Sequence, residues 1–253
     1  MYCKLGCIRD AFSLFNAMDP PSRHHPSTWH HMIGICARLG CLGNADTCFY
    51  RMLSEALVPG KNAFSSLLSL CVNRSHLPQG CRLHAQIWGS EHKHDVAMGT
   101  SLIIMYSKCS NLDDAIQVFH SLPSPDVVSW TALINTYVLY GKNKLALGAF
   151  HLLQHGDVII PSRVTFISIL SACIRREELN EGKEIHRCIK KNGFDYDVVV
   201  CNALISMYGR CGSLEDARDV FDAMLERNVV SWNAMIGAYA KSGDGREALT
   251  LGF

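Results

Sequence analysis

The chain has 253 residues, of which 48% are hydrophobic, and its formal net charge is +1. This balance excludes binding of nucleic acid or membrane through bulk positive charge, so any nucleic-acid contact must come from specific positions. Its 12 cysteines would suggest a disulfide framework only in a small secreted chain, and we expect most of them to be buried thiols. The longest apolar stretch, near residues 164–174, is too short to span a bilayer, so no membrane partner is expected.

A long repeat organises the chain. The sequence VVSWTALI at residues 127–134 returns as VVSWNAMI at residues 229–236, which is 102 residues later. The same offset links Phe64 with Phe166, Cys71 with Cys173, His84 with His186, and Met105-Tyr106 with Met207-Tyr208. A stack of similar helical units explains such spacing, because each unit must bury its apolar face against the next.

Shorter units lie within each repeat, and each predicts a pair of helices. In residues 198–228, Leu204 and Tyr208 share one face of a first helix, and Ala217 and Phe221 share one face of a second. Local signals mark the turns. We expect Gly212 to end the first helix, Ser213 with Asp216 to form a capping box for the second, and Asn111 to cap the matching helix one repeat earlier.

Several histidines are candidates for metal ligands or catalytic groups. Four of them lie close together in the sequence, but Pro26 interrupts them and no Cys or carboxylate completes a ligand set, so no metal is expected; they are His24, His25, His30 and His31. His84 and His186 occupy matching sites on predicted second helices, and we expect a structural role for them where units meet.

Three kinds of unit can be distinguished by their motifs. VVSWNAMIGAYAKSG at residues 229–243 resembles a P unit, RVTFISILSAC at 163–173 opens an L unit, and NALISMY at 202–208 with LEDAR at 214–218 resembles an S unit. Together they resemble the pentatricopeptide repeat (PPR) family, in its plant PLS subclass, over essentially the whole chain. The related tetratricopeptide arrays keep a period of about 34 residues, which the 31-residue units here do not fit.

The resemblance implies an all-α fold, a right-handed α-solenoid superhelix of stacked helix-turn-helix repeats in a single domain, 1–253. The expected units are 1–25 (partial S), 26–60 (P), 61–95 (L), 96–126 (S), 127–162 (P), 163–197 (L), 198–228 (S) and 229–253 (partial P). It also implies recognition of single-stranded RNA at one base per repeat. In the family, position 5 of a unit and its last residue read the base, and position 2 packs between neighbouring bases.

These roles are carried over by taking the Trp site of each unit as position 4. The implied base-reading residues are Thr100 with Asp126, Thr131 with Ser162, Asn202 with Asn228, and Asn233; the implied base-sandwiching residues are Val128, Val164, Val199 and Val230. By the family's code the three pairs read G, A, and C or U. Ile167, paired with Asp197, has no hydrogen-bonding capacity and implies a spacer unit, so the expected core target is 5′-G-A-N-Y-3′.

The remaining positions depart from the pattern. His30 with Gly60 matches no familiar pair, Ser65 is placed with Asp95, and position 2 is Ser27, Asn62 or Ala97 in the first three full units. RNA contact is therefore expected mainly from residue 127 onward.

The resemblance implies a role in a mitochondrion or chloroplast, with target recognition for RNA processing and C-to-U editing. The zinc signature of the family's editing deaminase, His-x-Glu with Pro-Cys-x-x-Cys, does not occur, so the chain is not expected to be an enzyme and a deaminase or editing factor would act in trans. The chain begins and ends inside repeats, which suggests a fragment without the C-terminal E/DYW extension. Two alternatives stay open: a protein-binding helical scaffold, and a non-functional truncated gene model.

Overall fold

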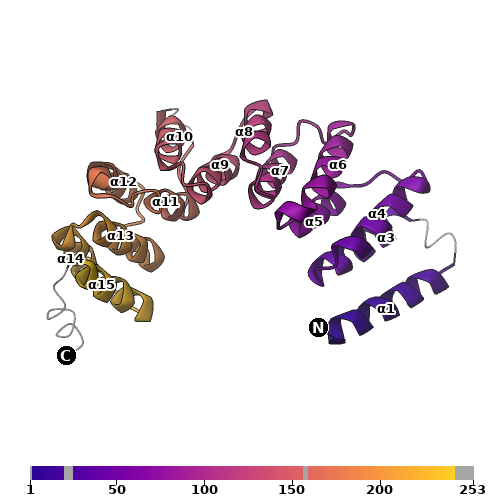
Figure 1. The fold of residues 1–253 in the computed structure, drawn as a ribbon, viewed down its shortest axis with the longest axis horizontal. Helices are drawn as coiled ribbons and strands as arrows, with labels where there is room; N and C mark the ends of the chain where they lie inside the picture. The colour runs from indigo at the N-terminus through magenta and orange to yellow at the C-terminus, as the bar shows by residue number, and fades with distance from the viewer. Residues whose placement is uncertain (1, 20–24, 156–158, 243–253) are drawn as a thin grey trace. The chain divides into compact units, whose positions relative to one another are not determined.

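The structure is a computed structural model that describes residues 2–19, 25–155 and 159–242, with the side chains of residues 9 onward in the first range. Every regular element in these ranges is helical (Figure 1). They form two compact parts, Met1–Pro125 and Asp126–Phe253, and each part is described by itself. The predicted unit boundaries and the single domain stay predictions.

The first part is a series of helix pairs. Its helices are α1 (Tyr2–Ala17), α3 (Pro26–Arg38), α4 (Leu42–Ser54), α5 (Lys61–Leu70), α6 (Leu77–Trp88), α7 (Val96–Lys108) and α8 (Leu112–Ser121), with a 3-10 turn η1 (Arg74–His76) before α6. The first helices pack in succession, α3 on α5 and α5 on α7. The second helices α4 and α6 each contact their own first helix and the next one.

The second part repeats this arrangement. It contains α9 (Val127–Leu139), α10 (Asn143–His155), α11 (Arg163–Leu170), α12 (Leu179–Lys191), α13 (Val198–Cys211), α14 (Leu214–Ala223) and α15 (Val229–Ser242), with η2 (Arg176–Glu178) before α12. Helices α9, α11, α13 and α15 form the layer of first helices, and α10, α12 and α14 pack against it. The predicted all-α architecture of stacked helix-turn-helix units is confirmed.

Aromatic pairs fill the space between successive hairpins. In each pair an aromatic residue of one unit's second helix meets the ring at position 4 of the next unit edge to face, and the ring centroids lie 4.6 to 6.1 Å apart: Phe15–Trp29, Phe49–Phe64, Phe150–Phe166 and Phe221–Trp232. Trp29, Phe64 and Phe166 are at most 1% exposed. A hairpin cannot bury these rings alone, so neighbouring units stabilise each other.

The predicted helix ends are confirmed at two sites and wrong at a third. Gly212 ends α13 in the left-handed conformation at φ 75°, and Asn111 Oδ1 accepts the Asp114 N–H at 3.2 Å. Ser213 does not cap α14 with its side chain. Its hydroxyl instead donates to Asp216 Oδ2 at 2.5 Å, a charge-assisted hydrogen bond between the two side chains.

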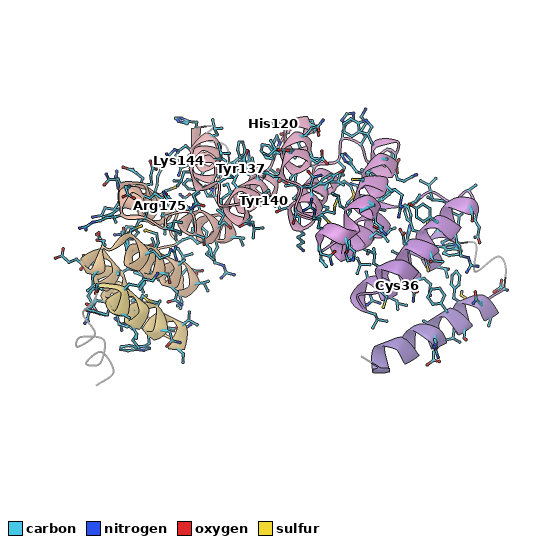
Figure 2. The ribbon with its side chains drawn as sticks, in the orientation of Figure 1. Cys36, His120, Tyr137, Tyr140, Lys144 and Arg175 are labelled. Carbon is cyan, nitrogen blue, oxygen red and sulfur yellow. The ribbon has the colours of Figure 1, made fainter. Side chains whose placement is uncertain are left out.

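The L units differ from the others in their first helix. Helices α5 and α11 have 10 and 8 residues, whereas α3, α7 and α9 have 13. After each short helix the chain becomes extended, at Asn73 and Arg175, and re-enters helical structure through η1 or η2 (Arg175 is labelled in Figure 2). The second helix of an L unit therefore begins after a longer connection.

The predicted structural role of the two matching histidines is confirmed. His84 Nδ1 and His186 Nδ1 each lie 2.8 Å from a tyrosine hydroxyl on the next unit's first helix, that of Tyr106 and Tyr208 respectively. The cysteines whose side chains the structure describes are free thiols, and most of them are buried, including Cys36 on α3 (Figure 2). In the described ranges, no helix combines the length and the apolar character needed to cross a bilayer.

Candidate nucleic-acid interface

The residues expected to read bases from the last position of a unit all lie at the start of the next first helix. Gly60, Asp95, Asp126, Ser162 and Asp197 are the N-cap residues of α5, α7, α9, α11 and α13. Asn228 has the same function for α15, because its Oδ1 accepts the N–H groups of Val230 and Ser231 at 2.9 and 3.1 Å. Apart from Gly60, which has no side chain, helix capping therefore fixes these side chains before any ligand binds.

A hydroxyl at position 3 of the following helix completes three of these caps. Ser129 Oγ accepts the Asp126 N–H at 2.8 Å, Thr165 Oγ1 accepts the Ser162 N–H at 3.1 Å, and Ser231 Oγ accepts the Asn228 N–H at 3.1 Å. In return, the side chain of each last residue accepts the backbone N–H of its position-3 partner. These reciprocal capping boxes hold Asp126, Ser162 and Asn228 in a defined orientation.

The predicted pair Asn202 and Asn228 is brought together. Asn202 on α13 is 8% exposed, and its Nδ2 lies 3.5 Å from Asn228 Oδ1. The Asn202 Oδ1 atom is buried and has no hydrogen-bond partner within the described part of the chain. Buried acceptors are nearly always paired, so a donor that reached this atom would supply the partner it lacks.

The predicted pair Thr131 and Ser162 is bridged by a third residue. Thr131 Oγ1 lies 2.7 Å from Thr165 Oγ1, which lies 2.9 Å from Ser162 Oγ. Thr131 is 7% exposed and also donates to Val127 O at 2.6 Å, so its hydroxyl is partly turned into the packing between α9 and α11. The sequence did not indicate Thr165 as a member of this site.

Thr100 and Asn233 have contrasting surroundings. Thr100 belongs to the first part, is 6% exposed and donates to Val96 O at 2.8 Å, while its predicted partner Asp126 belongs to the second part. Asn233 is exposed on α15. It lines a hollow of about 250 Å³ between α13 and α15 that also contains Ser206, Arg210 and Lys241.

One pair that matched no familiar code is also in contact. The Gly60 N–H donates to His30 Nε2 at 3.1 Å, and burial, followed by the nearby His31, lowers the pKa of His30. The other members of the histidine group have local contacts, since His25 accepts the Ser27 N–H at 3.3 Å and His31 Nδ1 lies 3.1 Å from Ser27 O. His24 lies outside the described residues. No group of His, Cys, Asp and Glu suited to a metal ion occurs among the residues with assigned positions.

The position-2 valines lie on the first turns of their helices and are exposed to solvent. Val128, Val164, Val199 and Val230 are 56, 54, 49 and 58% exposed. Ser27, Asn62 and Ala97 are exposed at the matching sites of the first part. A β-branched side chain is stiff, so each valine offers fixed apolar area at little further entropic cost.

The acidic last residues of the two L units form ion pairs. Lys61 Nζ contacts Asp95 Oδ2, and Arg163 Nη1 lies 3.4 Å from Asp197 Oδ2. The hydrogen bond from Lys61 is the main cause that lowers the pKa of Asp95. The two ion pairs join the first and last residues of the same unit.

Comparison with known proteins identifies the family. The model described as PPR repeat matches residues 1–19, 27–56, 100–124, 164–194, 199–229 and 230–252, and the model described as Pentatricopeptide repeat domain matches 124–176. The chain therefore belongs to the pentatricopeptide repeat family.

The relatives are longer proteins. A chloroplastic pentatricopeptide repeat-containing protein of Arabidopsis thaliana is 39% identical over 99% of this chain and 40% of its own length. A putative mitochondrial member from the same plant is 36% identical over 99% of this chain and 39% of its own length. The chain thus spans about 40% of these relatives.

Among solved structures, the fold resembles the pentatricopeptide repeat protein PPR10 in complex with an 18-nt psaJ RNA element. The TM-score is 0.53 at 17% identity, and the match covers 88% of this chain and 37% of PPR10. At this identity the likeness supports the fold alone.

Proposed function

We propose that this chain binds single-stranded RNA in a sequence-specific manner, with one base per repeat, and serves as the target-recognition element of an organellar RNA-processing event such as C-to-U editing. The observation that carries the proposal is the contact between Asn202 and Asn228, which are position 5 and the last residue of one unit, 198–228. The exposed valines Val199 and Val230 lie on the first turns of the same two helices, α13 and α15.

The chemistry of this pair suits a pyrimidine. Asn228 Oδ1 is occupied by the backbone N–H groups of α15, and its Nδ2 remains as a donor. The unpartnered Asn202 Oδ1 supplies an acceptor. Cytosine and uracil each present a donor and an acceptor on the Watson–Crick edge, so one donor and one acceptor from the protein match either base. The preference for these bases over purines follows the family's code.

The valines supply the second half of the mechanism. Bases of single-stranded RNA are not held in base pairs, and binding proteins provide surfaces against which they pack. Val199 and Val230 would lie on either side of the base read by Asn202 and Asn228. Val128 and Val164 would do the same for the base read by Thr131 and Ser162.

The remaining assignments follow the family's code. Thr131 with Ser162 is proposed to read A, and Thr100 with Asp126 to read G. The unit of Ile167 is proposed as a spacer, which gives the target 5′-G-A-N-Y-3′.

The relatives support the cellular setting of the proposal. Two of them are named as chloroplastic and mitochondrial pentatricopeptide repeat-containing proteins, and the PPR10 structure is named as an RNA complex. We propose that this chain acts in one of these organelles, that it is not itself an enzyme, and that a deaminase or other editing factor acts in trans at the RNA that it marks.

A binding experiment tests the pyrimidine assignment. Short labelled RNAs contain 5′-G-A-N-Y-3′ or the same sequence with a purine at the last position, and fluorescence anisotropy measures each Kd at fixed salt. The wild-type chain is expected to bind the pyrimidine RNAs about tenfold more tightly. The double variant Asn202→Thr/Asn228→Asp is expected to prefer G instead.

The outcome also separates the rival functions. Equal affinity for all four bases at this position would overturn the base assignment. A folded chain, judged by circular dichroism, with no measurable affinity for any of these RNAs would overturn RNA binding and favour a protein-binding scaffold.

A further inference from the structure

The side chain of the last residue is held in two different ways along the chain. After the P unit 127–162 and the S units 96–126 and 198–228, the following helix holds it through a capping box: Asp126 with Ser129, Ser162 with Thr165, and Asn228 with Ser231. After L units, position 3 of the following helix is Met98 or Val200 and has no hydroxyl. There a cation at position 1 of the L unit itself contacts the last residue.

The residue type at position 1 follows the same division. It is Val in the units that end at Asp126, Ser162 and Asn228, namely Val96, Val127 and Val198. It is Lys61 or Arg163 in the two units that end at Asp95 and Asp197. Valine cannot form an ion pair, so only the L units can neutralise their last residue in this way.

We propose that Lys61 and Arg163 are specificity-determining residues that occupy the outer carboxylate oxygen of Asp95 and Asp197 and thereby prevent these acids from selecting guanine. The inference rests on the proposed RNA-binding function and adds residues that determine base selection within the same site. It gives the L unit a physical reason to act as a spacer that is independent of the residue at position 5.

The geometry leaves no free oxygen on either carboxylate. Asp197 Oδ1 accepts the N–H groups of Val199 and Val200 at 2.9 and 3.1 Å, and its Oδ2 faces Arg163. Asp95 Oδ1 accepts the Met98 N–H at 3.0 Å, and its Oδ2 faces Lys61. A guanine amino group that approaches Oδ2 would therefore have to compete with the cation for this oxygen.

Stability does not explain the recurrence of these pairs. The side chains of Lys61 and Arg163 are 54 and 55% exposed, and the carboxylates 20 and 23%. Ion pairs in such a solvated setting contribute little to folding. The cations act directly on the carboxylate oxygens that they contact, and the lowered pKa of Asp95 agrees with this contact.

The test first creates the residue pair that selects guanine in the family's code, with Arg163 still present, and then removes the charge of Arg163. Ile167→Thr places a hydroxyl at position 5 opposite Asp197, and Ile167→Thr/Arg163→Met also removes the ion pair. Each is measured against RNAs with A, C, G or U at the third position of 5′-G-A-N-Y-3′. The wild type and Ile167→Thr are expected to bind all four within about twofold, whereas the double variant prefers G by about tenfold.

Control variants separate charge from side-chain loss. Ile167→Thr/Arg163→Lys keeps the cation and is expected to show no preference. Ile167→Thr/Arg176→Met removes an exposed cation of the same part that does not contact Asp197, and it too is expected to show no preference.

The inference is overturned if Ile167→Thr alone selects G, or if the double variant binds RNA without preference. Absence of RNA binding by every variant would overturn the proposed function and this inference together. A second readout needs no RNA: in NMR titration of the side-chain carboxyls, Lys61→Met should raise the pKa of Asp95, and Arg163→Met should leave it unchanged. An unchanged pKa of Asp95 in Lys61→Met would also count against the ion pair.

Discussion

The imidazole of His186 and the hydroxyl of Tyr208 are joined by a hydrogen bond of 2.8 Å between the second helix of an L unit and the first helix of the next. The same bond, also 2.8 Å, joins His84 and Tyr106 one repeat earlier. The short first helices α5 and α11 leave the second helices of the L units with a longer connection. These bonds therefore attach each such helix to the following unit.

Acid should loosen this attachment. Burial, followed by the charge of Lys190, lowers the pKa of His186 to about 4, while Asp216 and Asp195 oppose the shift. The unfolded chain, with a histidine pKa near 6.5, then binds more protons than the folded chain between these two values. The contribution of His186 is present above pH 6.5 and is lost progressively as the pH falls toward about 4.

Urea unfolding of the wild type and His186→Gln, followed by circular dichroism between about pH 7.5 and 4.5, measures this effect. The wild type should lose more stability on acidification than the variant. Identical pH dependence in the two chains would show that His186 does not titrate as described.

A second prediction concerns the close approach of α13 and α15. A Cβ atom added at Gly209 would lie 2.7 Å from Ala238 Cβ and 3.0 Å from Ala238 Cα. Because the obstacle includes backbone, Gly209→Ala should destabilise the chain by about 1–3 kcal/mol in urea unfolding. Gly237→Ala on α15 is the matched control, since nothing lies within 4 Å of its added Cβ, and it should stabilise by about 0.5–1 kcal/mol. Equal effects at the two sites would contradict the packing.

A third prediction concerns the end of α11. Arg210 donates from Nη2 to Leu170 O at 2.8 Å and from Nε to Cys173 O at 3.3 Å, and burial lowers its pKa. Arg210→Met removes both donors and should cost about 1–3 kcal/mol in the free energy of unfolding. Lys108 occupies the matching site one repeat earlier and is exposed. Lys108→Met should therefore change stability by less than about 0.5 kcal/mol, and a comparable loss in both variants would argue against the capping role of Arg210.

A fourth prediction addresses the stacking surface. Val199→Ala removes half-exposed apolar area from the proposed groove and should weaken RNA binding about three- to tenfold, with the base preference unchanged. Val72 is 52% exposed and lies just after the end of α5. Val72→Ala should leave the Kd unchanged. If both substitutions weaken binding equally, position 2 has no special role.

The helical stack follows from sequence spacing because the apolar period and the turn residues are local signals. Gly212 and Asn111 end and begin helices as expected, since each acts on its immediate neighbours. Ser213 does not, and its hydroxyl donates to the carboxylate of Asp216, which Lys183 on another unit's helix also contacts at 2.8 Å. A sequence pattern does not contain that long-range contact.

Some contacts of the candidate site could not be predicted from the sequence for a similar reason. The contact between Thr131 and Thr165 depends on how closely α9 approaches α11, and the ion pair of Arg163 with Asp197 depends on the rotation of α11. The sequence does contain one signal for where these side chains lie. Asp, Asn and Ser before an apolar helical run are typical N-caps, and the last residues of these units are of those types.

The capping role of the last residue restricts how recognition could be redesigned. Asp126, Ser162 and Asn228 each begin a helix with the same side chain that is proposed to face RNA. An engineer who wished to retarget such an array would have only the small polar residues that helices accept at their start. The set of bases that this architecture can select is therefore limited by which residues can start a helix.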